Sequence, residues 1–394
     1  MDSTLQNFIL QHREDDVRQL ALTASRYPDI DMPTALVQIS GWQTARQKLP
    51  LWAATPGILY PPHLNMEQCS SQLAASYKAS LVSPGATMTD LTAGFGVDAT
   101  LLSRQFQHLN YVEQDAQLCT LAQNNLPLLG VPHFTIHQAD AAETLRQLPH
   151  QDLIYIDPAR RDQHGSKVVA ISDCTPDITT LQDLLLQKAD TVLVKLSPML
   201  DLRTLLRTLK GLAEIHIVSV DGECKELLAK MQSTATEPTL FCVNLKTNGQ
   251  APDRLQFTLQ SEQTAICHYA EVPAGYLYEP NASIMKAGCF KTLAQTFSLE
   301  KLSPNSHLYT SSTPIDHFPG RIFKIETVSS FNKKELKQTL QHIHKANITV
   351  RNFPLTVAEL RKRLKLAEGG TDYLFATTLN DGRHVLIHTT TCAV

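Results

Sequence analysis

The stretch MTDLTAGFGVD, Met88 to Asp98, decides how the rest of the chain is interpreted. A short apolar strand runs into glycines spaced as in a dinucleotide-binding loop, and Asp90 stands four residues before the first of them. A carboxylate beside this turn does not suit a pyrophosphate, which is itself an anion, but it suits a ligand that carries a positive charge. Gly94 and Gly96 remove side chains where the backbone must approach the ligand closely. The loop therefore predicts a site for a ligand with a cationic part.

Around this loop, short apolar strands alternate with helical stretches. The expected strands are residues 88–93, 109–114, 133–140, 152–158, 190–198, 213–220 and 239–245. The expected helices between them are residues 98–106, 116–130, 141–148, 178–189, 202–212 and 223–231. This alternation predicts an α/β fold with a doubly wound, mostly parallel sheet and helices on both faces. In such sheets the ligand lies outside the carboxyl ends of the strands.

The parts of the chain before and after this region have different residue patterns. Residues 1 to about 80 carry apolar residues at spacings of three and four, which predicts a helical domain. After about Gln263 the strand–helix alternation ends, and residues 321–390 predict the order strand–helix–strand–helix–strand–strand, a small α+β domain. We expect four domains: 1–80 helical, 81–262 with the parallel sheet, 263–320 a small ferredoxin-like or linker domain, and 321–394 α+β.

Composition sets the broad class. The chain has 394 residues, of which 43% are hydrophobic, and no apolar run approaches the ~20 residues that cross a bilayer. The N-terminus lacks the pattern of a signal peptide. The eight cysteines form no C-x-x-C pair, which predicts reduced thiols in a cytoplasmic protein and no metal site.

Charge is distributed unevenly along the chain. Residues 320–394 contain 12 Lys and Arg against 6 Asp and Glu, while the whole chain has a net charge of −3. A basic C-terminal module on an acidic body indicates a polyanionic partner at that end. The alternative is an ordinary solvated helix face, RKRLK at 361–365.

Acidic residues end three successive expected strands. Asp90 ends the first, Glu113 the second and Asp140 the third. This series resembles the class I S-adenosylmethionine-dependent methyltransferases, and the resemblance runs from about Leu81 to Leu259. It implies a seven-stranded Rossmann-like core in which Asp90 orients the cationic part of the cofactor. Glu113 would accept both ribose hydroxyls, and Asp140 the adenine amino group. The same resemblance implies cofactor contacts by Thr92, Gly94, Gly96, Asp98 and Ala141. Alternatively, these acids cap helices.

The fourth strand ends in DLIYIDPARR, which places Asp157 and Pro158 just beyond an apolar run. The element resembles the D/N-P-P-x motif of methyltransferases that act on nucleobases. There the acid and a backbone carbonyl accept hydrogen bonds from the target amine and align its nitrogen. Ala159 and Arg160 replace the aromatic that stacks on the base, so Arg160 or Arg161 would stack on a base or bind phosphate. Alternatively, Arg160 pairs with Asp157.

D-P-x-R also resembles the element of uridine carbon-5 RNA methyltransferases. That chemistry needs a cysteine nucleophile after the fifth strand. KLSP at 195–198 supplies no cysteine, so we expect no covalent mechanism. Lys195 would face the pocket and contact substrate phosphate, or would simply end the strand.

Two flanking segments extend the resemblance. Residues 59–79 resemble a helical lid of trimethylguanosine-synthase-like RNA methyltransferases, which implies that Gln68 and Ser71 touch the cofactor. Helix capping by Ser70 or Ser71 is the alternative that the sequence favours. Residues from about Glu326 to Thr390 resemble a THUMP-like domain, which implies RNA recognition and accounts for the basic end.

The sequence thus predicts a cytoplasmic S-adenosylmethionine-dependent methyltransferase that acts by direct transfer on a nitrogen of a structured RNA, tRNA or rRNA. Asp157, Pro158 and Arg160 would be catalytic, and Arg160, Arg161 and Lys195 would bind substrate. The alternatives are a catalytically inactive RNA-binding adaptor and a small-molecule methyltransferase whose C-terminal domain serves oligomerisation.

Overall fold

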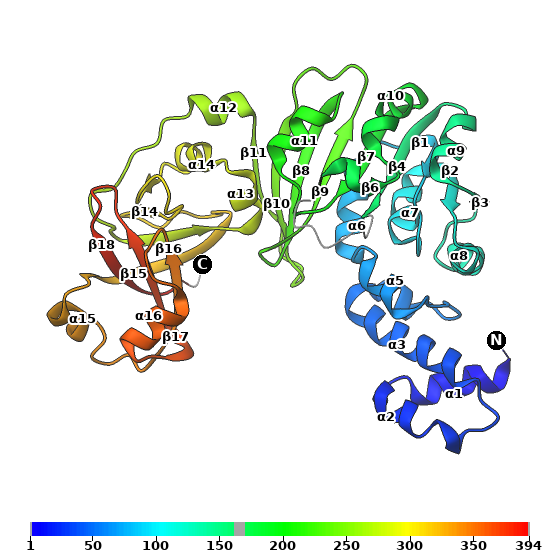
Figure 1. The fold of residues 1–394 in the computed structure, drawn as a ribbon, viewed down its shortest axis with the longest axis horizontal. Helices are drawn as coiled ribbons and strands as arrows, with labels where there is room; N and C mark the ends of the chain where they lie inside the picture. The colour runs from blue at the N-terminus through cyan, green and yellow to red at the C-terminus, as the bar shows by residue number, and fades with distance from the viewer. Residues whose placement is uncertain (1, 161–169, 393–394) are drawn as a thin grey trace. The chain divides into compact units, whose positions relative to one another are not determined.

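A computed structural model of the chain describes residues 2–160 and 170–392 (Figure 1). The chain divides into two compact units. The first consists of Met1–Ala213 and Leu227–Glu237, and the second of Glu214–Glu226 and Pro238–Val394. In the part of the chain that the structure describes, no helix is both long enough and apolar enough to cross a membrane.

The N-terminal part of the first unit is helical. Its elements are α1 (Ser3–His12), α2 (Val17–Leu22), η1 (Ala24–Arg26), α3 (Met32–Lys48), α4 (Pro50–Ala54), α5 (His63–Gln68) and α6 (Gln72–Ala79). Aspartates at positions 2, 16 and 31 cap α1, α2 and α3 by accepting backbone N–H bonds. The prediction of helical structure before residue 80 is confirmed.

These helices pack onto the segment that carries the glycine loop. One buried cluster joins Trp52 and Met66 from the helices to Phe95 and Val97 from the loop. Burying large side chains of this kind stabilises by about 1.5–3 kcal/mol each. The N-terminal helices therefore support the loop and are not a detached appendage.

Helices and strands alternate in the next part of the chain. The strands are β1 (Gly85–Asp90), β2 (Phe106–Glu113), β3 (Phe134–Gln138), β4 (Gln151–Ile156), β5 (Ala159–Arg160), β6 (Cys174–Thr175), β7 (Ala189–Leu196), β8 (Leu212–Val220), β9 (Glu223–Met231), β10 (Thr239–Leu245) and β11 (Asp253–Phe257). The helices are α7 (Val97–Leu102), η2 (Ser103–Gln105), α8 (Ala116–Leu128), α9 (Ala141–Gln147), η3 (Ile171–Asp173), α10 (Ile178–Lys188), α11 (Leu202–Thr208) and α12 (Leu259–Thr264).

The main sheet has the strand order β11-β10-β8-β9-β7-β4-β1-β2-β3. Strands β3, β2, β1, β4 and β7 pair in parallel, so their carboxyl ends share one edge. β4 is buried along almost its whole length, as expected for a strand with both faces covered. The α/β class and the mostly parallel core sheet predicted from the sequence are confirmed.

One element differs from its prediction. ECKELLAKM, expected to be a helix, is strand β9, which pairs antiparallel with β7. Asp221 and Gly222 both have positive φ, 48° and 81°, the backbone of a two-residue hairpin turn that sends the chain straight back from β8. The turn residues and the buried run Glu226–Ala229 outweigh the helix propensity of Glu, Lys, Leu and Ala. TLFCVNL, expected as the seventh strand of the core, is β10 and pairs with β8.

The rest of the second unit forms a separate sheet with the order β13-β14-β12-β15-β18-β17-β16. Its elements are β12 (Tyr276–Pro280), α13 (Ala282–Ala287), α14 (Phe290–Thr296), β13 (Glu300–Lys301), β14 (Tyr309–Ser311), β15 (Gly320–Ser330), α15 (Lys333–Thr339), β16 (Lys345–Arg351), α16 (Val357–Leu364), β17 (Ala367–Thr378) and β18 (His384–Thr391). The order strand–helix–strand–helix–strand–strand expected from Arg321 onward is confirmed.

Candidate functional site

The loop between β1 and α7 is held in one conformation by its own side chains and by β2. Asp90 Oδ1 accepts the N–H of Thr92 at 2.9 Å, which folds the chain back at the strand end. Gly94 and Gly96 have φ of 56° and 83°, values that favour glycine. The hydroxyl of Tyr111 on β2 donates to the carbonyl of Gly94. The loop is thus preformed.

Asp90 itself is an unusual carboxyl group, because it is only 1% exposed. Burial raises its pKa well above the ordinary value, the Thr92 N–H acts in the opposite direction, and the carboxylates of Asp98, Asp157 and Glu113 raise it further. Asp90 therefore lies in the electrostatic field of three other acids. A cationic ligand beside Asp90 would offset their repulsion of its charged form, which is the chemistry the sequence predicts.

Glu113, at the end of β2, is directed at the same loop. Its Oε2 accepts the N–H of Gly94 and its Oε1 the N–H of Asp115, both at 2.9 Å. Each carboxylate oxygen has a further lone pair, so these bonds leave capacity for ligand hydroxyls. The structure therefore brings Asp90, Gly94 and Glu113 together, as the sequence predicts.

Asp140 caps a helix, which is the alternative role that the sequence allows for the strand-end acids. Its Oδ1 caps α9 by accepting the N–H groups of Ala142 and Glu143. Its Oδ2 accepts Gln114 Nε2 at 2.8 Å, and Gln114 directly follows Glu113. Asp140 is thus linked to the end of β2, and Ala141 beside it is buried. A contact of Asp140 with a nucleobase stays a prediction.

Asp98 is the centre of a buried polar cluster that sequence reasoning did not find. Its carboxylate pairs with Lys78 Nζ at 3.0 Å and accepts the hydroxyls of Ser70 at 2.7 Å and Tyr155 at 2.8 Å. The Lys78 side chain is fully buried. Burial opposes ionisation of Asp98, but Lys78, Lys195 and the two hydroxyls outweigh it and lower its pKa.

This cluster ties helix α6 to the loop and to β4. It gives Ser70 a role other than the capping considered from the sequence, whereas Ser71 does cap α6, by accepting the N–H of Ala74. Asp98 was expected to contact cofactor, and the structure shows it as the anchor of the loop's far end. Nothing in the pattern SYKAS marks Lys78, because a lone helical lysine is normally exposed.

The end of β4 carries the candidate catalytic group. The N–H of Asp157 donates to Thr92 Oγ1 at 2.7 Å, which joins the D-P-A-R element to the glycine loop. Asp157 Oδ2 pairs with Lys195 Nζ from the end of β7. The side chain of Asp157 is 34% exposed and that of Lys195 15%. The partner of Asp157 among the described residues is therefore Lys195. The side chain of Arg160 and all of Arg161 lie outside the described residues.

A second lysine, Lys48 at the end of α3, lies close to Lys195. Burial lowers the pKa of Lys48, and the charge of Lys195 adds to this effect. Lys48 Nζ donates to the carbonyl oxygens of Met66 and Glu67 at 2.8 and 2.6 Å. Lys48 lies some 150 residues from Lys195 in the chain, so no sequence motif could connect them.

The thiol of Cys69 stands beside the same two lysines. Burial raises its pKa, and the charges of Lys48 and Lys195 only partly counter that. A catalytic cysteine needs the opposite shift, toward the thiolate. The raised pKa therefore does not favour Cys69 as a nucleophile.

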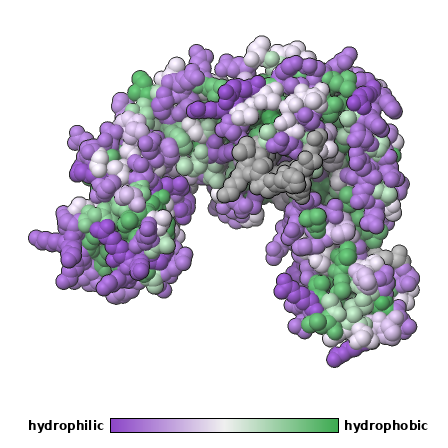
Figure 2. Space-filling model, viewed as in Figure 1, coloured by the Kyte–Doolittle hydropathy of each residue, from purple (hydrophilic) through white to green (hydrophobic). Residues whose placement is uncertain are grey.

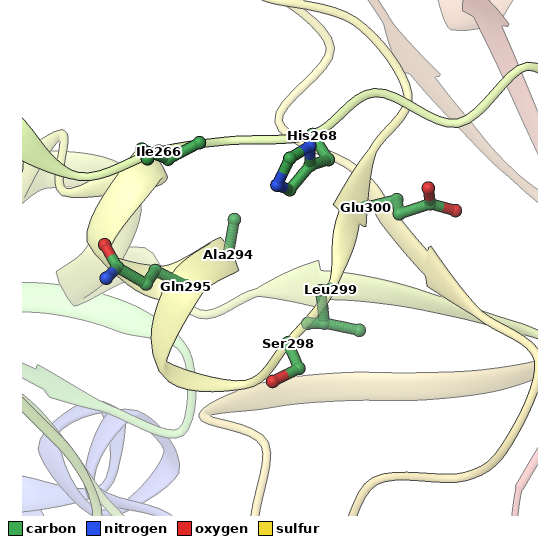
Figure 3. A pocket seen from close by; sticks show the side chains of 7 residues that line it. All are labelled: Ile266, His268, Ala294, Gln295, Ser298, Leu299 and Glu300. Carbon is green, nitrogen blue, oxygen red and sulfur yellow. The ribbon is translucent and has the colours of Figure 1, made fainter.

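Two hollows of the described structure lie elsewhere. One of about 760 Å³ is lined by residues that begin β2 and precede β3, at the amino edge of the sheet. Another of about 420 Å³ belongs to the second unit, and there Glu300 directs its carboxylate away from the other labelled side chains (Figure 3). The lining residues of the second hollow are Ile266, His268, Ala294, Gln295, Ser298, Leu299 and Glu300. Neither contains the clustered acids, so the chemistry of the carboxyl edge locates the candidate site.

Parallel strands ending in clustered acids, followed by a D-P element, define a class I methyltransferase type of domain, here with further domains after it. Family models match three stretches: a THUMP domain-like model residues 320–391, a ferredoxin-like domain model residues 276–319, and a model described as conserved hypothetical protein 95 residues 76–185. The crystal structure of a "putative methyltransferase from Porphyromonas gingivalis W83" is 35% identical, with a TM-score of 0.88, over 99% of this chain and 98% of that one. The chain belongs to the family of that protein.

Other solved structures resemble the chain only in part. M. capricolum TrmK in complex with S-adenosyl-homocysteine is 10% identical, with a TM-score of 0.33, over 42% of this chain and 69% of that one. An rRNA methylase from Streptococcus thermophilus is 9% identical, with a TM-score of 0.31, over 41% and 93%. Likeness at this level carries no argument about function. No curated protein matches the chain.

Proposed function

We propose that the protein is a cytoplasmic methyltransferase that uses S-adenosylmethionine to methylate a nitrogen of a nucleobase in structured RNA, tRNA or rRNA. The observation that supports this most strongly is the buried Asp90. Its carboxyl group lies at the end of β1 in the field of three other acids, beside a preformed glycine loop. Such a set of groups fits a nucleoside with a cationic amino-acid part.

The residues present fit the cofactor. Asp90 would take the cationic part, Gly94 leaves the backbone open to it, and Glu113 has acceptor capacity for ribose hydroxyls. Gly96, whose side-chain position is filled by Tyr111, would contact the cofactor through its backbone. When bound, S-adenosylmethionine supplies an electrophilic methyl group. Thr92, Asp98, Asp140 and Ala141 remain in the proposed cofactor set, with Asp98 acting as the anchor of the loop.

The D-P-A-R element would hold the acceptor. Asp157 has Oδ2 engaged by Lys195, which leaves Oδ1 to accept a hydrogen bond from the target amine. Pro158 fixes the backbone after Asp157. The rate would come from alignment of the nitrogen lone pair, because a held nucleophile needs little acid–base assistance. Arg160 and Arg161 stay proposed substrate contacts.

Lys48 and Lys195 favour an anionic substrate. Lys195 pairs with Asp157, and the charge of Lys195 contributes to the lowered pKa of Lys48. An incoming phosphate would relieve the repulsion between the two ammonium groups. A nucleotide within RNA brings such a phosphate, and an uncharged small molecule does not.

Two measurements test the proposal. Isothermal titration should show micromolar binding of S-adenosylmethionine or its demethylated product, and undetectable binding by the wild-type protein would end the cofactor assignment. Tritiated methyl transfer to total RNA from cells that lack the protein should show incorporation that Asp157→Ala abolishes. Binding of cofactor and RNA without incorporation would favour the inactive adaptor, and incorporation into a metabolite fraction alone would favour the small-molecule enzyme.

A further inference from the structure

The positive charge of the THUMP-like region is concentrated in one segment. Residues 330–366 contain nine Lys and Arg against two acids, Glu335 and Glu359. The remaining residues of 320–394 contain three Lys and Arg against four acids. The excess noted from the sequence therefore belongs to α15, β16, α16 and their connections alone.

The fold gathers this segment on one face of the sheet. Leu336 of α15 and Leu360 of α16 both pack in the buried cluster that contains Leu374 and Leu386. The next residues along the same strands, Phe375 and Ile387, belong to the cluster on the opposite face. Both helices thus cover the same side, with their polar faces outward. In the view of Figure 2 the surface around α15 is largely hydrophilic.

The two acids of residues 330–366, Glu335 and Glu359, are both engaged in helix capping. Glu335 accepts the N–H of Ser330 at 2.7 Å and Asn332 Nδ2 at 2.6 Å. Glu359 accepts both the N–H and the hydroxyl of Thr356 at 2.8 Å. These bonds lower the pKa of both carboxyls. Neither acid forms an ion pair with a lysine or arginine of the described chain.

The lysines and arginines of residues 330–366 differ in their partners from those in the rest of residues 320–394. Arg321, Lys324 and Arg383, the three outside, each form an ion pair with a carboxylate. Within the described residues, seven exposed cations of residues 330–366 have no ion pair: Lys345 at the start of β16, and six that lie in α15, in α16 or directly after α16. We call these six the basic face: Lys333, Lys334, Lys337, Lys362, Arg363 and Lys365.

We propose that the basic face holds the phosphate backbone of structured RNA. This inference rests on the proposed function and extends it by naming the surface. A membrane would require apolar side chains on the outer side of the helices, whereas the leucines of α15 and α16 are packed against the sheet. Unpaired, flexible lysines suit phosphates and carry no sequence information, so the basic face positions the RNA and does not select the target base.

The test uses the full-length protein and fluorescently labelled bulk tRNA at several salt concentrations. K333Q/K334Q/K337Q removes the cations of α15, and K362Q/R363Q/K365Q those of α16. The matched control, K225Q/K324Q/R383Q, removes three exposed cations that each have a carboxylate partner. Each basic-face triple should weaken tRNA binding at least tenfold and reduce the slope of log K against log salt by about 2 to 3. The control should change affinity less than twofold.

The outcomes separate this inference from the proposed function. Titration of S-adenosylmethionine into every variant should give the wild-type affinity, which also shows that the variants are folded. Loss of tRNA binding in the basic-face triples supports the surface even when no methyl transfer is found. An equal loss in the control triple, or competition by polyglutamate as effective as that by tRNA, overturns the assignment to RNA phosphate.

Discussion

Asp90 shows most clearly what a single side chain contributes to this protein. Its pKa is raised because it is buried and faces Asp98, Asp157 and Glu113. At a pH below that raised pKa the carboxyl is protonated, and a cationic ligand must displace the proton. We therefore predict that S-adenosylmethionine binds more tightly as pH rises through the Asp90 pKa, and that binding releases a proton below it.

Titration calorimetry in buffers of different ionisation enthalpy measures this proton directly. Asp90→Asn should weaken binding by about tenfold to a hundredfold, as expected for loss of a charged hydrogen-bonding partner, and should remove the pH dependence. Asp152→Asn is the control, because Asp152 accepts the N–H groups of Ala86 and Thr87 at the amino end of the sheet. An unchanged pH profile in Asp90→Asn would assign the proton to another group.

Lys78 and Asp98 form a buried ion pair in which each side chain compensates the charge of the other. Removing one partner of a buried pair leaves an uncompensated charge, so Lys78→Met should lower the free energy of unfolding by about 3–5 kcal/mol. The double variant Lys78→Met/Asp98→Asn should recover part of that loss. Chemical denaturation of the three proteins measures both effects, and strictly additive losses would contradict the coupling.

The pH dependence of this pair has a definite sign. The pKa of Asp98 is lowered in the folded state, so its contribution to stability is present above the unfolded value of about 3.9. It is lost as pH falls through the folded value. The stability difference between wild type and Asp98→Asn should therefore shrink on acidification below about pH 4.

The two glycines of the loop between β1 and α7 should differ in how they tolerate substitution. A Cβ at Gly94 would meet only the Thr92 carbonyl at 3.9 Å, whereas a Cβ at Gly96 would lie 3.1 Å from Tyr111 Cε2. Both have positive φ, so alanine strains either position by about 1–2 kcal/mol. We expect Gly96→Ala to lower the melting temperature and cofactor affinity more than Gly94→Ala does. The reverse order in thermal unfolding would show that the loop is not pinned by Tyr111.

We propose that Lys48, at the end of α3, contacts the substrate together with Lys195. Lys48→Gln should raise KM for RNA several-fold and leave cofactor affinity unchanged, whereas Lys48→Arg should restore most of the activity. Lys188→Gln is a close control, because Lys188 is also half-buried, also donates to a backbone carbonyl, that of Leu148, and precedes the amino end of β7. A KM unaffected by Lys48→Gln would remove this lysine from the substrate site.

For the molecule as a whole, the two proposed ligands should differ in their response to salt. RNA binding depends on phosphate neutralisation and should fall steeply between 50 and 200 mM salt. The proposed cofactor site consists of a few acids and the glycine loop and neutralises no row of phosphates, so S-adenosylmethionine binding should change little. Parallel titrations of tRNA and S-adenosylmethionine check this difference. A shallow salt dependence for both would favour a small-molecule substrate.

The sequence predicted the strands well where periodicity and length agreed, and it failed at β9. There a helix-forming composition, ECKELLAKM, competes with the hairpin turn at Asp221 and Gly222. The pairing of β9 with β7 is a long-range contact that no local pattern encodes. The D-G dipeptide was nonetheless a usable hairpin signal.

Apart from β9, the sequence by itself determined the order of strands and helices in the core, the acids at three strand ends, the D-P element and the basic C-terminal region. Those features are local, because strand ends and turns are marked by the residues that form them. Only the tertiary structure decided which charges meet: Lys78 with Asp98, Lys195 with Asp157, and Lys48 beside Cys69. Burial and the distance between charges fix a side chain's pKa and partner, and both arise only when distant segments pack together.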